Sequence, residues 1–216
     1  MRNFPLPDGK AAVTLLLLAA ISVPVCVLGQ EPDAAAGKKV PVPGTAVPAS
    51  SYQPPSAKDR FRQYLQDLYG PSAPIKAGVM AGIDQFRRDP PEWKQGGTGF
   101  AKRFGSKLGE SAIEETARYA LASTLHEDTR YYRCTCAGVL PRLGHALLSG
   151  VTARATDGHR VVSIPDLVAP YAGGLAAAGA WYPDRFGPKD GIRRGTISLG
   201  IRAGVSVVHE FLRVRK

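Results

Sequence analysis

The longest helical pattern in the chain spans residues 98–125 and leads directly into a polar cluster at 126–136. At 100° per residue, small side chains gather on one side of this segment and charged side chains on the other. The small set is Gly105, Gly109, Ala112, Thr116, Ala120 and Ser123, and the charged set is Arg103, Lys107, Glu110, Glu114 and Arg118. This separation predicts that the small face packs closely against other helices while the charged face meets water.

Two shorter helices are expected before this segment. Ser56 and Asp59 have the spacing of a helix-capping pair, and the helix that they begin should end at Gly70-Pro71. An apolar stripe marks the second helix, which Asp89-Pro90-Pro91 should end. The stripe consists of Ile75, Val79, Ile83 and Phe86.

Three further segments follow the polar cluster. Residues 141–153 predict a helix, and Asp157-Gly158 predicts the turn of a small β-hairpin near residues 152–163. A helix should begin after Ser163 and be kinked or broken at Pro170. Its residues 167–182 include no charged side chain over sixteen positions, which we interpret as a buried helix rather than a membrane span, with a re-entrant or peripheral membrane segment as the alternative.

The segment at residues 196–208 is ambiguous. Its apolar residues fit a helical stripe, yet apolar and small side chains also alternate strictly, as in a two-faced strand. Helix is preferred because the other segments resemble capped helices. The resulting fold prediction is mainly α, a compact Gly/Ala-rich bundle of about six helices with a small β-hairpin near residues 152–163.

The N-terminal residues 1–29 have the composition of a signal peptide, with Arg2 and Lys10 before and beside an apolar run. A lipid attached at Cys26, or an uncleaved membrane anchor, are the alternatives. Residues 30–57 are rich in proline and predict a disordered linker, so that residues 58–216 form a single helical domain. We therefore expect export to the periplasm or cell envelope.

The chain is basic, with a formal charge of +10 that becomes +9 when Arg2, Lys10 and Asp8 leave with the signal peptide. A basic exported protein suits an anionic envelope polymer, a lipid surface or an envelope protein as partner, or it has a solvated basic surface without a specific partner. Nucleic acid is excluded because no basic-aromatic motif of a known binder occurs and export separates the protein from it.

Candidate catalytic residues lie in and near the polar cluster. Imidazole and carboxylate groups at His126, Glu127, Asp128 and His145 could transfer protons or, together with His209 and Glu210, hold a metal. The spacing matches no established metal or catalytic motif, and no cofactor is predicted. The alternative interpretation is structural, with Asp128 and His145 capping helix ends.

Aromatic and basic residues form two further patches that could stack on a glycan, lie at a lipid interface or complete the core. They are Arg130, Tyr131 and Tyr132 in the cluster, and Trp181, Tyr182, Asp184 and Arg185 near the end of the fifth helix. Cys134 and Cys136 are disulfide candidates, although residues two apart need a bent backbone to bridge. Free thiols and intermolecular bridging remain the alternatives.

Four motifs carry a resemblance: His-Glu-Asp-x-Arg-Tyr-Tyr at 126–132, Arg-x-Gly-His-Ala at 142–146, Trp-Tyr-Pro-Asp-Arg at 181–185, and His-Glu-Phe at 209–211. Together they resemble a group of uncharacterised exported bacterial proteins, which implies a helical domain behind a signal peptide and no particular activity. The leading hypothesis is a non-catalytic envelope-associated protein that binds an anionic envelope component or a protein partner. The alternative is a hydrolase-like enzyme, with or without a metal, that uses His126, Asp128 and His145.

Overall fold

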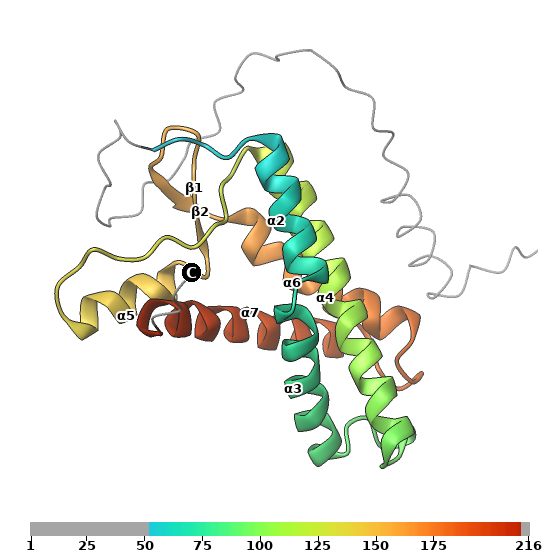
Figure 1. The fold of residues 1–216 in the computed structure, drawn as a ribbon. Coiled ribbons are helices and arrows are strands. Elements are labelled where there is room, and N and C mark those ends of the chain that lie inside the picture. The colour runs from blue at the N-terminus through green and yellow to red at the C-terminus, as the bar shows by residue number, and fades with distance from the viewer. Residues whose placement is uncertain (1–51, 213–216) are drawn as a thin grey trace, which may run out of the picture.

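A computed structural model describes residues 52–212 (Figure 1). The predicted signal peptide and nearly all of the predicted linker therefore lie outside the described residues. The elements in order are α2 (Ala57–Tyr69), α3 (Ser72–Arg87), the short 3-10 helix η1 (Pro91–Trp93), α4 (Gly97–Leu125), α5 (Val139–Leu148), β1 (Thr152–Arg154), β2 (Arg160–Val162), α6 (Ile164–Ala180) and α7 (Pro188–Phe211). The prediction of a mainly α fold with a small hairpin is confirmed.

Local signals explain where several helices begin. The Ser56 hydroxyl accepts a hydrogen bond from the backbone N–H of Asp59 at 3.2 Å and caps α2. The Ser163 hydroxyl caps α6 in the same way, through the N–H of Asp166 at 3.1 Å. Both caps satisfy backbone donors that have no partner inside the helix.

The structure decides the alternatives left open in α7 and α6 and moves one predicted boundary, the end of α5. α7 is helical throughout 188–211, as preferred, so the strand alternative for 196–208 is wrong; the helix packs on α6 through Gly191 and Gly195, before that segment. α6 continues through Pro170 without a break. α5 ends at Leu148, and Ala153 belongs to β1, where it pairs with Val161 in the antiparallel hairpin.

α6 lies between α4 and α7 and contacts both along most of its length (Figure 1). The helices approach closely at glycines: a Cβ on Gly174 would lie 2.3 Å from the carbonyl oxygen of Gly191. Any larger side chain at Gly174 would force α6 and α7 apart. Gly191 and Gly195 also lie close to Leu175 and Tyr171 of α6, whereas a Cβ added at Gly105, on the predicted small face of α4, would have no neighbouring atom within 4 Å.

The predicted orientation of α4 is wrong. Arg103 and Arg118, assigned to the water face, are only 1% and 4% exposed, while Thr116 and Ala120 of the small face are exposed. The reason is that the charged side chains find partners inside the protein: carbonyl oxygens in the α3–α4 turn surround Arg103, and acidic groups surround Arg118. Internal pairing replaces hydration for these groups.

α3 shows a similar pattern. Its predicted apolar stripe points outward, with Val79 59% and Phe86 91% exposed, whereas Ala73, Ala77 and Ala81 are buried. Small residues let α3 lie close along α4, and large apolar side chains remain on the outside. Within residues 52–212, no helix combines the length and apolar character that crossing a membrane requires.

Candidate functional site

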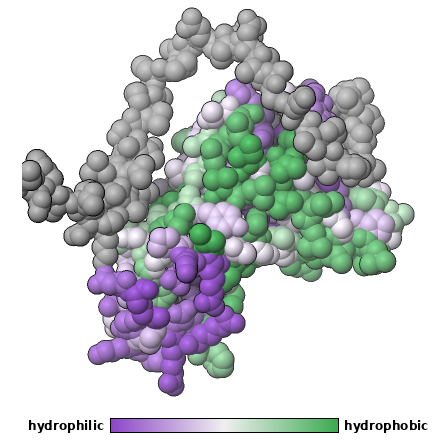
Figure 2. Space-filling view, turned by 180° about the vertical axis from the view of Figure 1, so that it is seen from behind, coloured by the Kyte–Doolittle hydropathy of each residue, from purple (hydrophilic) through white to green (hydrophobic). Residues whose placement is uncertain are grey.

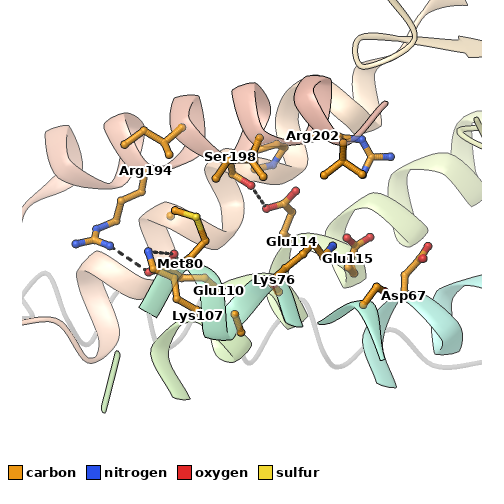
Figure 3. A pocket seen from close by; sticks show the side chains of 18 of the residues that line it. Asp67, Lys76, Met80, Lys107, Glu110, Glu114, Glu115, Arg194, Ser198 and Arg202 are labelled. Atoms are coloured by element: carbon orange, nitrogen blue, oxygen red, sulfur yellow. Dashed lines mark hydrogen bonds and ion pairs between the residues drawn. The ribbon is translucent and has the colours of Figure 1, made fainter. Parts of the chain in front are cut away.

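A groove runs along the charged side of α4. α4 forms its floor, α3 and the end of α2 form one wall, and α7 forms the other (Figure 3). Its volume is about 410 Å³, within the range of roughly 300–1,000 Å³ that is typical of small-molecule sites. The walls contribute apolar side chains, which are Met80 and Ile83 from α3 and Ile197, Ile201 and Val205 from α7. The groove therefore combines a charged floor with apolar walls.

Arg118 is buried beside the floor and does not line the groove itself, but it binds two acidic side chains that do. Its guanidinium binds Glu114 at 2.5 Å, Glu115, and Asp166 of α6 at 3.0 Å. Arg202 of α7 also binds Asp166, at 2.8 Å. Because these five charged side chains meet where most of them are largely removed from solvent, each depends on its partners for stability.

Two further contacts tie α7 to α4 across the floor. The Ser198 hydroxyl donates to Glu114 at 2.6 Å, and Arg194 lies 3.4 Å from Glu110 (Figure 3). Lys107 binds Glu110 at 3.3 Å and Asp84 of α3 at 3.2 Å. These contacts hold both walls at a fixed position relative to the floor.

Some charged groups in the groove are less completely paired. Asp67 and Lys76 both line it, and neither has a hydrogen bond or ion pair to another residue in the part of the chain that the structure describes. Burial and the neighbouring Glu115 raise the pKa of Asp67, against the attraction of Arg202 and Lys76. At Glu115, burial also raises the pKa, but the charge of Arg118 outweighs it and the pKa is lowered.

Asp128, a predicted catalytic candidate, lies buried beside the hairpin with a full set of donors. Arg130 binds its carboxylate at 2.8 Å, Tyr132 at 2.7 Å and Tyr52, from the predicted linker, at 3.0 Å. Its backbone also pairs with Arg154 of β1. Burial raises the pKa of Asp128, but the hydrogen bonds from Arg130 and Tyr132 outweigh this effect and lower it. Burial and the bond to Asp128 raise the pKa of Tyr132 to about 12.

Glu210 forms the second such cluster. Its carboxylate accepts hydrogen bonds from Tyr131 at 2.5 Å, Arg142 at 2.8 Å and the backbone N–H of Cys134 at 3.2 Å. Its side chain is buried, so these donors replace water. The cluster joins the end of α7 to α5 and to the loop after α4.

The histidines have separate surroundings. The Nε2 atom of His145 lies 2.5 Å from the Arg160 guanidinium, and burial together with the charge of Arg160 lowers the pKa of His145. A neutral imidazole that accepts from Arg160 fits this geometry. His126 is exposed at the end of α4, and His209 is exposed with its ring centroid 6.1 Å from that of Tyr131. Across residues 52–212, no hydrogen bond or ion pair joins any two of His126, Asp128 and His145.

Glu127 is half-buried and lines a small cavity between α2 and α4. Within the described range, no three His, Cys, Asp or Glu side chains are placed to hold a metal ion. Cys134 and Cys136 are joined by a disulfide with their Cα atoms 5.2 Å apart, a separation within the usual range.

In the second aromatic patch only Tyr182 is buried, and Trp181 is 37% exposed. The Trp181 indole donates to Ser106 at 2.8 Å, and buried Tyr182 accepts from Arg194 at 2.7 Å. Arg185 binds Glu92 at 2.6 Å, while Asp184 is exposed. Trp181 and Tyr182 therefore connect the end of α6 to α4 and α7.

A broad apolar surface lies on the opposite side of the molecule from the view in Figure 1. Figure 2 shows hydrophobic side chains spread over this face, with hydrophilic ones gathered at the end where α3 turns into α4. Exposed large apolar residues on α6 are Ile164, Val168 and Leu175, and those on α5 are Val139, Leu140, Leu147 and Leu148. We call these seven residues the α5–α6 face.

Sequence reasoning missed the groove, although its floor residues had been noticed. The available signal was the stripe of Lys107, Glu110, Glu114 and Arg118, which we assigned to water because charged helix faces are usually solvated.

Comparison with protein-family models, curated proteins and solved structures gives no match to this chain.

Proposed function

We propose that this protein is a non-catalytic, envelope-associated protein that attaches to an anionic lipid surface through its α5–α6 face. The observation that carries the proposal is the composition of α6. Its one charged residue, Asp166, is buried, so the outward side of this helix presents Ile164, Val168 and Leu175, the partly exposed Leu167 and Tyr171, and small neutral side chains, but no charge. A helix that faced water permanently would ordinarily have polar residues on that side.

α5 supports the same proposal. Val139, Leu140, Leu143 and Leu147 share one side of this helix, and Leu140 is 79% exposed. An amphipathic helix of this kind can lie in the plane of a membrane surface with its apolar side among the lipid chains. Covering the apolar surface would contribute about 25 cal/mol per Å² removed from water.

Charge gives a reason to choose an anionic surface. The sequence is basic, and Arg213, Arg215 and Lys216 are among its cations. A basic residue near an anionic lipid surface contributes about 1 kcal/mol. The formal charge of +9 expected after signal removal, to which these three residues contribute, favours anionic over neutral lipid.

The contacts of the candidate catalytic residues favour a non-catalytic protein. Asp128 accepts from three side chains, and its lowered pKa makes it a poor general base. His145 is engaged by Arg160 rather than by a carboxylate. A hydrolase would need these groups to converge on a substrate.

Vesicle flotation tests the proposal with protein that lacks residues 1–29. We expect binding to vesicles that contain phosphatidylglycerol, weaker binding to neutral phosphatidylcholine vesicles, and weakening of binding by added salt. Val168→Asp and Leu140→Asp should each reduce binding at least about tenfold, because a charge must then enter the apolar layer. Val79→Asp on α3 is the matched control and should bind like the parent protein. Equal binding of all three variants would refute attachment through the α5–α6 face.

A further inference from the structure

We infer that the groove binds a zwitterionic amphiphile, with an ammonium group held at Asp67, a phosphate held between Lys76 and Arg202, and a hydrocarbon portion lying between α3 and α7. The inference concerns a different surface from the α5–α6 face and does not rest on the proposed attachment to lipid.

The first step concerns the acidic end of the groove. Asp67 lines the groove without a hydrogen bond or ion pair to another residue in 52–212, next to Glu115, whose carboxylate is already bound to Arg118. Burial and the charge of Glu115 raise the pKa of Asp67. A positive group placed between these two carboxylates would relieve both effects, and an ammonium also supplies three hydrogen-bond donors.

The second step concerns the basic side. Lys76 points into the groove from α3, and Arg202 reaches it from α7 (Figure 3). Arg202 uses one terminal nitrogen on Asp166, and the described part of the chain provides Lys76 with no ion-pair partner. Both cations act electrostatically on Asp67 and on Glu115, so the four groups form one site. A phosphate has enough oxygens to accept from both cations at once.

The third step concerns a buried atom behind this site. Asp166 is fully buried, and its Oδ1 atom accepts from Arg118 and Arg202 while its Oδ2 atom has no partner among the described residues. Arg202 is thus held by one carboxylate oxygen, and its side chain is 27% exposed on the groove side. A bound phosphate would find Arg202 already oriented, because the buried carboxylate fixes its guanidinium.

The fourth step concerns the walls. Met80 and Ile83 face Ile197, Ile201 and Val205 across the groove, and they leave its long sides apolar above the charged floor. A small polar molecule would use the floor and leave these walls exposed to water. A head group joined to hydrocarbon would cover both, which is why we choose an amphiphile over a soluble zwitterion.

Isothermal titration calorimetry on protein lacking residues 1–29 tests the inference with short-chain lipids below their micelle concentration. We expect saturable binding of dihexanoylphosphatidylethanolamine and at least about tenfold weaker binding of dihexanoylphosphatidylglycerol, which lacks the ammonium. Loss of one charge-assisted hydrogen bond corresponds to roughly that factor. Phosphoethanolamine alone, which lacks the chains, should also bind at least about tenfold more weakly.

Variants locate the binding site. Asp67→Asn and Lys76→Met should each weaken dihexanoylphosphatidylethanolamine binding at least about tenfold. Lys102→Met, which removes an exposed lysine of α4 outside the groove, should leave it unchanged. Binding unaffected by Asp67→Asn and Lys76→Met would overturn the site, and absence of saturable binding would overturn the inference. If phosphoethanolamine bound as tightly as dihexanoylphosphatidylethanolamine, the hydrocarbon part of the inference would be wrong, and the ligand would be a soluble zwitterion. Val168→Asp, which tests the α5–α6 face, should not alter this titration.

Discussion

Two regions of this protein bury carboxylates, and they treat them differently. Beside the hairpin, Asp128 and Glu210 each accept hydrogen bonds from several side-chain and backbone donors. At the groove, Asp67 on the α2 wall has no donor among the described residues, and behind the floor one oxygen of the buried Asp166 has none. The first region supplies its buried carboxylates with hydrogen-bond donors, whereas the second leaves some carboxylate oxygens without a donor.

The pKa directions follow this difference. Hydrogen bonds outweigh burial at Asp128 and Glu210 and lower both pKa values. Burial and a neighbouring acid raise the pKa of Asp67. A satisfied carboxylate adds to the stability of the fold, and an unsatisfied one reduces it. The comparison teaches that the groove floor keeps a cost in stability that a bound ligand could offset.

The largest expected effect is at Arg118, because its guanidinium forms ion pairs with three carboxylates at and behind the groove floor. Arg118→Met would leave Glu114, Glu115 and Asp166 buried with less compensation. We expect the free energy of unfolding to fall by about 3–5 kcal/mol, measured by urea denaturation. Arg118→Lys is the control: it keeps the charge but cannot bind three carboxylates, so its loss should be intermediate. A loss below about 1 kcal/mol for Arg118→Met would contradict this account of buried ion pairs.

The second prediction tests the satisfied region. Asp128→Asn removes the charge that Arg130 and the two tyrosines share, and it should lower the free energy of unfolding by about 1–3 kcal/mol at neutral pH. The exposed Asp157→Asn in the hairpin turn is the control and should change stability much less.

The sign of the pH dependence follows from the lowered pKa of Asp128. Its contribution is present above the unfolded-state pKa of about 4 and disappears as pH falls through the lower folded-state pKa. The difference between parent and Asp128→Asn should therefore shrink below about pH 4. A difference that stays constant from pH 7 to strongly acidic pH would show that Asp128 does not act through its charge.

Much of the fold could be predicted from sequence because the signals were local. The Ser56 and Ser163 caps, the Asp157-Gly158 turn and the length of α4 depend on neighbouring residues alone. The orientation of α4 could not be predicted in this way. A charged stripe has the same sequence pattern whether it faces water or, as here, a buried partner such as Asp166 of α6. The partner lies 48 residues along the chain from Arg118.

The candidate site was missed for a related reason. We selected residues by chemical type, and histidines beside acids led us to His126, Asp128 and His145. The type of a residue does not reveal whether its side chain already has hydrogen-bond partners in the fold. Asp128 proved to have its donors in place, while Asp67, which carried no motif, lies in the groove without one among residues 52–212.

The smallest expected effect is that of Asp67→Asn. It is also the sharpest test of the comparison, because this substitution should raise the free energy of unfolding, whereas those at Arg118 and Asp128 should lower it. The pKa of Asp67 is raised, so ionisation costs the folded state free energy above that pKa, and the cost is absent below the unfolded-state value. Asp67→Asn should therefore raise the free energy of unfolding at neutral pH, by less than about 1 kcal/mol because the group is partly exposed. The gain should vanish as pH falls below about 4. Urea denaturation at pH 7 and pH 3 measures both values, and a destabilised Asp67→Asn at pH 7 would mean that Asp67, like Asp128, is a satisfied structural acid. A stabilised variant that has also lost binding of the short-chain zwitterion would identify the groove as the region where this fold gives up stability for a ligand.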